Sequence, residues 1–256
     1  MPDATYPPLD ALKPVAADLW IVDSGPLRVL GLPLPVRMTV VRLSDGGVLL
    51  HSPTRYDPDL HADIEAIGPI RHLVAPNIAH WTFLQAWQRH CPRALTWAAP
   101  NLGKRRQVRR SGLRIDRVLG DAAPPEWAAD LAQVVVPGGL GFREVAFFHG
   151  ASRTLILTDL VLNLEPAKLG PLLGPVLRLA GMTAPAGSPP PYLRLAIRLR
   201  RRDAARAAAR LVALAPRQVI FAHGAWFERD AVSRLRQSLR WLGDLGPEAG
   251  RAGVAA

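Results

Sequence analysis

The sequence predicts a single α/β domain. Strand and helix patterns alternate along its first half, hairpin signals join several of the strands, and 49% of its 256 residues are hydrophobic. A chain of this length and composition can bury one large core. No repeat of fixed period divides it, and the early strands cannot easily be cut apart from a later hairpin. One domain is therefore the expected organisation.

The first half is expected to alternate between short strands and helices. The turn Ser44-Asp45-Gly46-Gly47 lies between two β-branched runs and is a hairpin signal. Asp57-Pro58-Asp59 is typical of a helix start, and Phe83, Leu84 and Trp87 have helical spacing. These signals predict strands over 19–22, 37–43, 47–51, 71–75 and 95–98, and helices over 60–67 and 79–90.

The second half begins with a hairpin and ends in helices. Two apolar runs flank Gly150-Ala151-Ser152 as the arms of a hairpin, and Pro137-Gly138-Gly139 forms the turn before it. Residues 166–191 are rich in proline and glycine, which predicts broken helix. The remaining pattern predicts strands over 131–136, 143–148, 154–157 and 218–222, and helices over 192–214 and 226–242.

Composition excludes several classes of protein. Cys91 is the one cysteine, so an intrachain disulfide and a thiolate-rich metal cluster are excluded, and a reducing cytoplasm fits. The N-terminus lacks the basic and apolar regions of a secretory signal. The most apolar stretch, 169–182, is interrupted by glycine, proline and arginine, short of the roughly 20 apolar residues of a spanning helix. A cytoplasmic location is expected.

A net charge of +11 can indicate nucleic-acid binding. Only three of the 32 basic residues are lysines, and the excess of arginine accompanies abundant alanine, proline, leucine and glycine. This pattern indicates that the charge reflects a general bias in amino-acid composition. No specific nucleic acid is therefore expected as a partner. The cluster 104–110 predicts a solvated surface. In 192–214, arginines interleave with leucines, so this segment could act as a lid, as a partner surface or as a contact with an anionic membrane.

The order of these elements resembles the metallo-β-lactamase superfamily. Several phrases also resemble a bacterial branch of it, domain-of-unknown-function family 4336: RMTVVRLSDGGVLLHSP, HLVAPNIAHWTF, FFHGASRTLILTDLV and IFAHG. The resemblance implies an αββα sandwich of two mixed β-sheets flanked by helices. It divides the chain into an N-terminal extension (1–14), the domain (15–242) with a helical insertion at about 160–214, and a flexible tail (243–256).

The superfamily binds metal through an HxHxDH motif, a later His, an Asp and a final His, and this chain keeps only part of that set. The motif's place is taken by residues 75–80, where Ala75, Asn77 and Ala79 stand for its first His, second His and Asp. His80 matches its last His. Gly139 stands where the later His would follow a Pro-Gly pair.

The matching residues imply at most one metal ion. Asp159 follows an apolar strand and His223 ends another, as the superfamily's bridging Asp and final His do. In dinuclear members, the counterparts of His80, Asp159 and His223 belong to one metal position. The resemblance therefore implies a single zinc, iron or manganese ion, with a site that binds no metal as the alternative.

Other polar residues have weaker claims. His51 ends a strand where the superfamily usually has a supporting Asp, so it is a candidate for contact with the ligands, as is Asn77, which could also orient substrate. Glu144 is expected at the surface or in a salt bridge, and His149 is expected to be exposed. No catalytic residue is assigned.

Two functions remain open. The first is a metal-dependent hydrolase of a small ester, thioester, lactone or phosphoester. The second is a catalytically inactive member of the fold that binds a ligand, a protein or a membrane surface through its basic helices. Neither the substrate nor the oligomeric state follows from the sequence.

Overall fold

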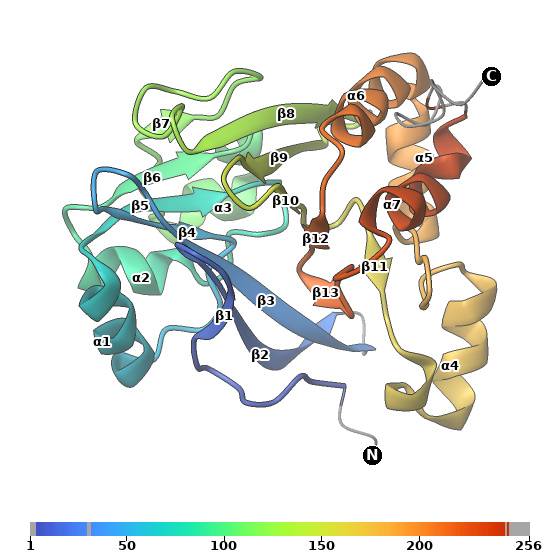
Figure 1. Ribbon diagram of the computed structural model, residues 1–256, viewed down its shortest axis with the longest axis horizontal. Helices are drawn as coiled ribbons and strands as arrows, with labels where there is room; N and C mark the ends of the chain where they lie inside the picture. The colour runs from blue at the N-terminus through green and yellow to red at the C-terminus, as the bar shows by residue number, and fades with distance from the viewer. Residues whose placement is uncertain (1–3, 30–31, 244, 246–256) are drawn as a thin grey trace, which may run out of the picture.

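The computed structural model describes residues 4–29, 32–243 and 245, and it has the predicted two-sheet architecture with helices outside (Figure 1). The seven-stranded first sheet has the order β1-β2-β3-β4-β5-β6-β7, antiparallel as far as β4 and parallel from there on. Its strands are β1 (Lys13–Ala16), β2 (Leu19–Val29), β3 (Leu32–Arg42), β4 (Val48–His51), β5 (Ile70–Ala75), β6 (Leu95–Ala98) and β7 (Arg117–Val118).

The second sheet has the order β12-β10-β9-β8. The hairpin of β9 and β10 is antiparallel, and β12 joins β10 in parallel. Strands β11 and β13 form a separate parallel pair; β11 follows β10 along the chain, and β13 follows β12. The strands are β8 (Leu131–Pro137), β9 (Arg143–His149), β10 (Thr154–Ile156), β11 (Leu162–Asn163), β12 (Gln218–Ile220) and β13 (His223–Gly224).

Helices cover the outer face of each sheet. The first sheet carries α1 (Pro58–Ile67), α2 (Leu84–His90) and α3 (Arg106–Ser111), and the second carries α5 (Pro191–Arg198), α6 (Arg201–Ala213) and α7 (Ala231–Leu239). Helix α4 (Gly170–Leu179) stands at one corner of the molecule (Figure 1). Short 3-10 helices span Leu102–Lys104, Pro166–Lys168 and Arg240–Leu242.

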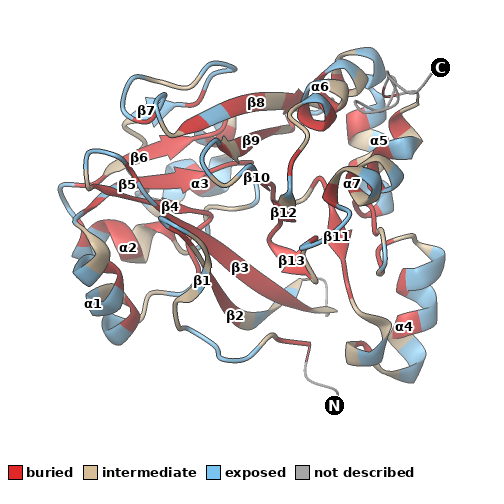
Figure 2. Ribbon diagram, in the orientation of Figure 1, coloured by how far each residue is buried: buried red, intermediate tan, exposed pale blue. Residues whose placement is uncertain are grey.

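Three apolar layers follow from this arrangement (Figure 2). Period-2 alternation sends successive strand residues to opposite faces. On β9, Val145 and Phe147 point between the sheets, where they meet Val41 and Val74 of the first sheet, while Ala146 packs beneath the helices of the second. A third layer lies between the first sheet and α1, α2 and α3. The stacking is the αββα sandwich that the resemblance implied.

Three helix predictions were wrong in their boundaries. Helix α2 begins at Leu84 instead of residue 79, because the Asn77 side chain accepts the backbone N–H groups of Ala79 and His80 and competes with the helical pattern. The predicted helix 192–214 is two helices, α5 and α6, which pack on different partners. Helix α7 starts late because Phe227 pairs with Val219 as an isolated β-bridge.

The predicted hairpin at Ser44–Gly47 is confirmed, with β3 and β4 antiparallel on either side of it. Strands β2 and β3 are longer than the predicted strands 19–22 and 37–43, since each has 11 residues. In the expected tail, Leu245 is buried against the α5–α7 core, while residues 244 and 246–256 lie outside the described residues. In the described part of the chain, none of the helices combines the length and the apolarity required to cross a bilayer.

Candidate metal centre

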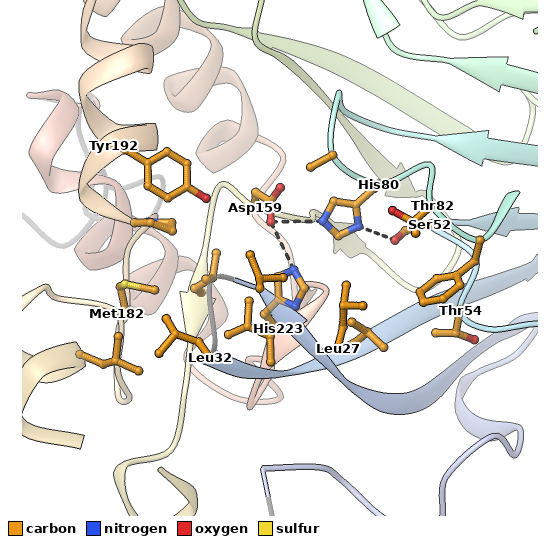
Figure 3. A pocket seen from close by; sticks show the side chains of 18 of the residues that line it. Leu27, Leu32, Ser52, Thr54, His80, Thr82, Asp159, Met182, Tyr192 and His223 are labelled. Atoms are coloured by element: carbon orange, nitrogen blue, oxygen red, sulfur yellow. Dashed lines mark hydrogen bonds and ion pairs between the residues drawn. The ribbon is translucent and has the colours of Figure 1, made fainter. Parts of the chain in front are cut away.

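Three loops that follow strand ends bring His80, Asp159 and His223 together. His80 lies in the loop after β5, Asp159 follows β10, and His223 begins β13 just after β12. The Nε2 atoms of the two histidines lie 3.2 and 3.3 Å from Asp159 Oδ1 (Figure 3). One ligand atom from each residue lies within 4.8 Å of the others. Among the described residues, no other set of three histidine, cysteine or acidic side chains converges in this way.

Hydrogen bonds on the far side of each ring fix how the histidines face Asp159. His223 Nδ1 lies 2.7 Å from the carbonyl oxygen of Pro35, which can only accept, so this nitrogen carries the proton. His80 Nδ1 lies 2.6 Å from Ser52 Oγ. With the proton on Nδ1, Nε2 is the nitrogen of His223 that faces the carboxylate of Asp159. A metal-ligating histidine typically has this arrangement, with its other ring nitrogen donating to a carbonyl.

The donor set fits a metal ion of the expected kind. Two imidazole nitrogens and one carboxylate oxygen are typical ligands of zinc, iron and manganese, and three protein ligands leave coordination positions open. The electrostatics agree. Burial opposes charge on Asp159, but His80 and His223 outweigh it and hold the pKa of this carboxyl well below its usual range. Burial lowers the pKa of His80, but Asp159 reverses the effect and raises it overall.

Asn77 connects the two loops that carry His80 and Asp159. It is fully buried, and its Nδ2 donates to Asp159 Oδ2 at 2.8 Å and to Thr158 Oγ1 at 3.0 Å. Its Oδ1 accepts the backbone N–H groups of Ala79 and His80. The amide thus lies behind the ligands and orients them, and it is not among the residues that line the adjoining pocket.

The prediction that Glu144 lies at the surface or in a salt bridge was wrong. The side chain is fully buried on β9, and its carboxylate accepts the backbone N–H groups of Thr158, Asp159 and Leu160 at 2.8, 2.9 and 3.1 Å. Burial and the neighbouring Asp159 raise the pKa of Glu144, and the N–H bonds from Thr158 and Asp159 oppose that rise. Its position in a strand, two residues before the core residue Ala146, was the one signal that it points inward.

His51 lies near the centre without joining it. Its side chain is buried with its ring edge-on to Phe147, and among the described residues its Nε2 has no hydrogen-bond partner. Burial lowers the pKa of His51 to about 3, and His80 adds to the lowering. None of the described hydrogen bonds connects its side chain to the three ligands. His149, expected to be exposed, is also buried, and its Nδ1 bonds Ser152.

At two positions where the superfamily has metal-binding histidines, this chain has small residues that are packed against other parts of the fold. Ala75 is buried at the end of β5. Gly139 lies under α5, with its N–H bonded to the carbonyl of Ala196 at 2.7 Å. A Cβ at position 139 would lie 2.6 Å from Leu199 Cδ1. Helix α5 therefore leaves no room for a side chain where the superfamily's later histidine would stand.

A buried ion pair holds the His223 loop. Arg37 of β3 donates through Nη1 to the carbonyls of Phe221 and Gly224 at 3.0 and 2.9 Å, and its Nη2 lies 2.7 Å from Asp23 Oδ1. Both side chains are almost fully buried. Arginine is suited to this role because its fork carries several donors in fixed geometry. Nothing in the sequence indicates this role of Arg37, since one arginine among many has no distinguishing pattern.

The centre opens into a cavity of about 440 Å³. The cavity lies between the β2–β3 hairpin, α4 with the segment after it, and the start of α5, and the three ligands form part of its wall (Figure 3). Tyr192 of α5 points its hydroxyl toward Asp159. Burial raises the pKa of Tyr192, and Asp159 raises it further, so the phenol stays neutral at physiological pH.

Solved structures similar to this chain share the metallo-β-lactamase fold. A metallo-β-lactamase from Pontibacter korlensis is 15% identical, with a TM-score of 0.58 over 90% of this chain and 98% of that one. The FIM-1 metallo-β-lactamase from Pseudomonas aeruginosa in its mono-zinc form is also 15% identical, with a TM-score of 0.58 and coverage of 89% and 93%. The Flv1 flavodiiron core from Synechocystis sp. PCC6803 is 12% identical, with a TM-score of 0.60 and coverage of 91% and 60%. At these identities the likeness concerns the fold alone.

No curated protein matches the sequence. One family model, described as Domain of unknown function (DUF4336), matches residues 17–172, which is more than half of the chain. The match covers strands β2 to β7 of the first sheet and the loops that carry His80 and Asp159. The chain belongs to the DUF4336 family and has the metallo-β-lactamase fold.

Proposed function

We propose that the protein is a hydrolase that uses one metal ion held by His80, Asp159 and His223. The observation that carries the proposal is the convergence of two Nε2 atoms on Asp159 Oδ1 in the wall of a cavity, with the Nδ1 of His223 committed to a backbone carbonyl. Zinc, iron and manganese all fit the donor set. The chemistry that such an ion supplies is Lewis-acid activation of a water and a carbonyl group.

The chain's own residues would bind the substrate and hold the site in shape. Ser52 and Pro35 keep the two imidazole rings turned toward Asp159, and Asn77 and Glu144 hold the Asp159 loop. Such contacts behind metal ligands are typically worth 10- to 100-fold in metal affinity or activity. From the wall of the cavity, the neutral Tyr192 hydroxyl could donate a hydrogen bond to a substrate oxygen.

The test is ester hydrolysis by chelator-treated protein and by the same protein reloaded with zinc, iron(II) or manganese(II). Activity should return with one of the metals and disappear in His80→Ala, whereas the exposed-histidine control His90→Ala should keep it. Activity that survives chelation but is lost in Ser52→Ala would overturn the proposal. It would assign the reaction to the hydrogen-bonded chain Ser52–His80–Asp159 instead.

A second candidate function is binding to an anionic membrane surface. The exposed face of α4 carries Leu172, Val176 and Leu179, which are 88%, 61% and 92% exposed. Residues 166–214 hold nine arginines and lysines against one aspartate, so +8 of the net charge of +11 lies in this segment. Exposed leucines flanked by arginines suit a surface of acidic lipids.

Vesicle sedimentation tests this candidate. The protein should sediment with phosphatidylserine-containing vesicles more than with phosphatidylcholine vesicles, and the double variant Leu172→Ser/Leu179→Ser should lose most of that binding. Val118→Ser removes a comparably exposed residue on the distant strand β7 and should have no effect (Figure 1). Equal binding to both vesicle types, or no binding, would contradict it.

A further inference from the structure

The cavity beside the metal centre has an aliphatic wall. The β2–β3 hairpin and the α4 region contribute side chains from opposite sides, and several of them form one apolar cluster. The aliphatic residues that line the cavity are Leu27, Val29, Leu32, Leu34, Val36, Leu162, Leu177 and Met182. Its volume of about 440 Å³ falls within the range typical of small-molecule sites, about 300–1,000 Å³.

The charge of the cavity is unlike that of the rest of the protein. The chain has 32 arginines and lysines, yet none of the described residues that line the cavity is one of them. Asp159 is its one acidic residue, and the uncharged polar side chains are Ser52, Thr54, Thr82 and Tyr192. Phosphate and carboxylate groups are recognised in proteins by arginine and lysine. Apart from the two histidines of the metal centre, an anionic substituent in this cavity would face leucines and the Asp159 carboxylate, with no arginine or lysine to pair with it.

We propose that this site takes an uncharged substrate with an aliphatic chain, which is an ester, a thioester or a lactone and not a phosphoester. The chain would lie against Leu27, Leu32 and Leu34, with the carbonyl beside His80, Asp159 and His223. Water would add to the acyl carbon, the C–O or C–S bond would break, and the leaving oxygen or sulfur would take a proton, which gives a carboxylic acid. The reaction rests on the proposed hydrolase function, whereas binding of the chain does not.

Chain length should control affinity, because the wall offers aliphatic contacts along the cavity. Each methylene buried contributes about a fourfold gain in affinity. The gain should stop when the cavity is filled. A charged head group on the same chain should reduce the affinity sharply, since its desolvation is not compensated by an opposite charge.

Displacement of the neutral fluorescent probe N-phenyl-1-naphthylamine from the chelator-treated full chain tests the binding, because without a metal ion the protein offers no bound cation to attract an anion. Butanol, hexanol and octanol should displace it with increasing affinity, and octyl phosphate and octanoate should displace it at least tenfold more weakly than octanol. Leu27→Arg and Leu32→Gln, at partly exposed positions on the two strands of the hairpin, should weaken octanol binding about tenfold or more. Val118→Arg, at an exposed position on the distant strand β7, should leave it unchanged.

The outcomes separate this inference from the proposed function. If chelator-treated protein binds octanol but no metal supports hydrolysis, the substrate class stands as a binding specificity and the hydrolase proposal fails. If metal-loaded protein hydrolyses acetate and octanoate esters equally well, the hydrolase stands and the aliphatic site is overturned. Octyl phosphate that binds as tightly as octanol, or octanol that does not displace the probe, also overturns it.

Discussion

Asp159 is the residue at which the candidate site is most tightly determined. One carboxylate oxygen faces both histidines and the other accepts from Asn77, while Glu144 accepts the backbone N–H groups of Asp159 and its two neighbours. A loop held through its backbone can place a charged side chain in a buried position that the charge alone would oppose.

Replacement of Glu144 should show how much the loop depends on it. Glu144→Ala strands three buried N–H groups, and each such donor costs about 1–3 kcal/mol. The variant should therefore lose about 3 kcal/mol or more of unfolding free energy in urea, and Glu144→Gln, which keeps one acceptor oxygen, should lose less. Glu126→Ala, at an exposed position, should stay within about 0.5 kcal/mol of the parent. A Glu144→Ala variant as stable as Glu126→Ala would contradict this assignment.

His51 should make the fold sensitive to acid. Its pKa is about 3 in the folded protein and 6.5 ordinarily, so the unfolded chain binds more protons between these values. The contribution of neutral His51 to the free energy of unfolding is therefore fully present above pH 6.5 and is lost as the pH drops toward 3. About 2 kcal/mol of it is lost between pH 7 and pH 5. In urea unfolding, the free energy of unfolding of His51→Phe should fall between pH 7 and pH 5 by about 2 kcal/mol less than that of the parent. An identical pH dependence in both proteins would exclude His51 as the cause.

At this scale, the resemblance to the metallo-β-lactamase superfamily pointed to His80, Asp159 and His223, and no pattern pointed to the roles of Glu144 and Arg37. His80, Asp159 and His223 stand at strand ends next to turns, where loops can converge. Glu144 and Arg37 act through backbone groups of other elements: Glu144 accepts from residues 14 to 16 positions further on, and Arg37 reaches the carbonyl of Phe221, 184 residues away. Such a partner depends on tertiary structure, so no local pattern indicates it.

Among the helices and strands, α5 is the element that excludes a further metal ligand at position 139. The helix packs directly on the turn that holds Gly139, and its first residues form part of the cavity wall. The same helix thus closes the place of one absent ligand and shapes the pocket of the ligands that remain.

Substitution of Gly139 should displace α5 without creating a second metal position. A Cβ there would lie 2.6 Å from Leu199 Cδ1 and 3.2 Å from the carbonyl of Ala196. Gly139→Ala should lose about 1–3 kcal/mol of unfolding free energy, as crowded cores typically do. Gly139→His should bind no more metal than the parent by elemental analysis. Gly120→Ala is the control, because its nearest neighbour would be 3.9 Å away. A second ion in Gly139→His would refute this account of α5.

The elements themselves were predictable in order but not in extent. Alternating patterns and turn residues located the strands of both sheets except the two edge strands of the first sheet, β1 and β7, since these signals are local. The start of α2 was not predictable, because the Asn77 side chain takes the N–H groups that the helix would use. The split between α5 and α6 has no helix-breaking residue, and each helix follows the surface on which it packs.

For the molecule as a whole, the candidate centre joins the two halves of the sandwich. His80 comes from the first sheet, and Asp159 and His223 come from loops that leave the second. Arg37 adds a direct connection between the first sheet and the His223 loop. An ion bound by all three ligands would stabilise this junction by mass action, because it binds the folded state.

Elemental analysis of protein purified without chelators tests the central claim most directly. The parent and Asp63→Ala, an exposed control on α1, should each carry one zinc, iron or manganese ion per chain, and Asp159→Ala should carry none above background. Chelator should lower the melting temperature of the parent and leave that of Asp159→Ala unchanged. A parent protein that holds no metal after incubation with all three ions, and whose melting temperature chelator does not change, would contradict the claim.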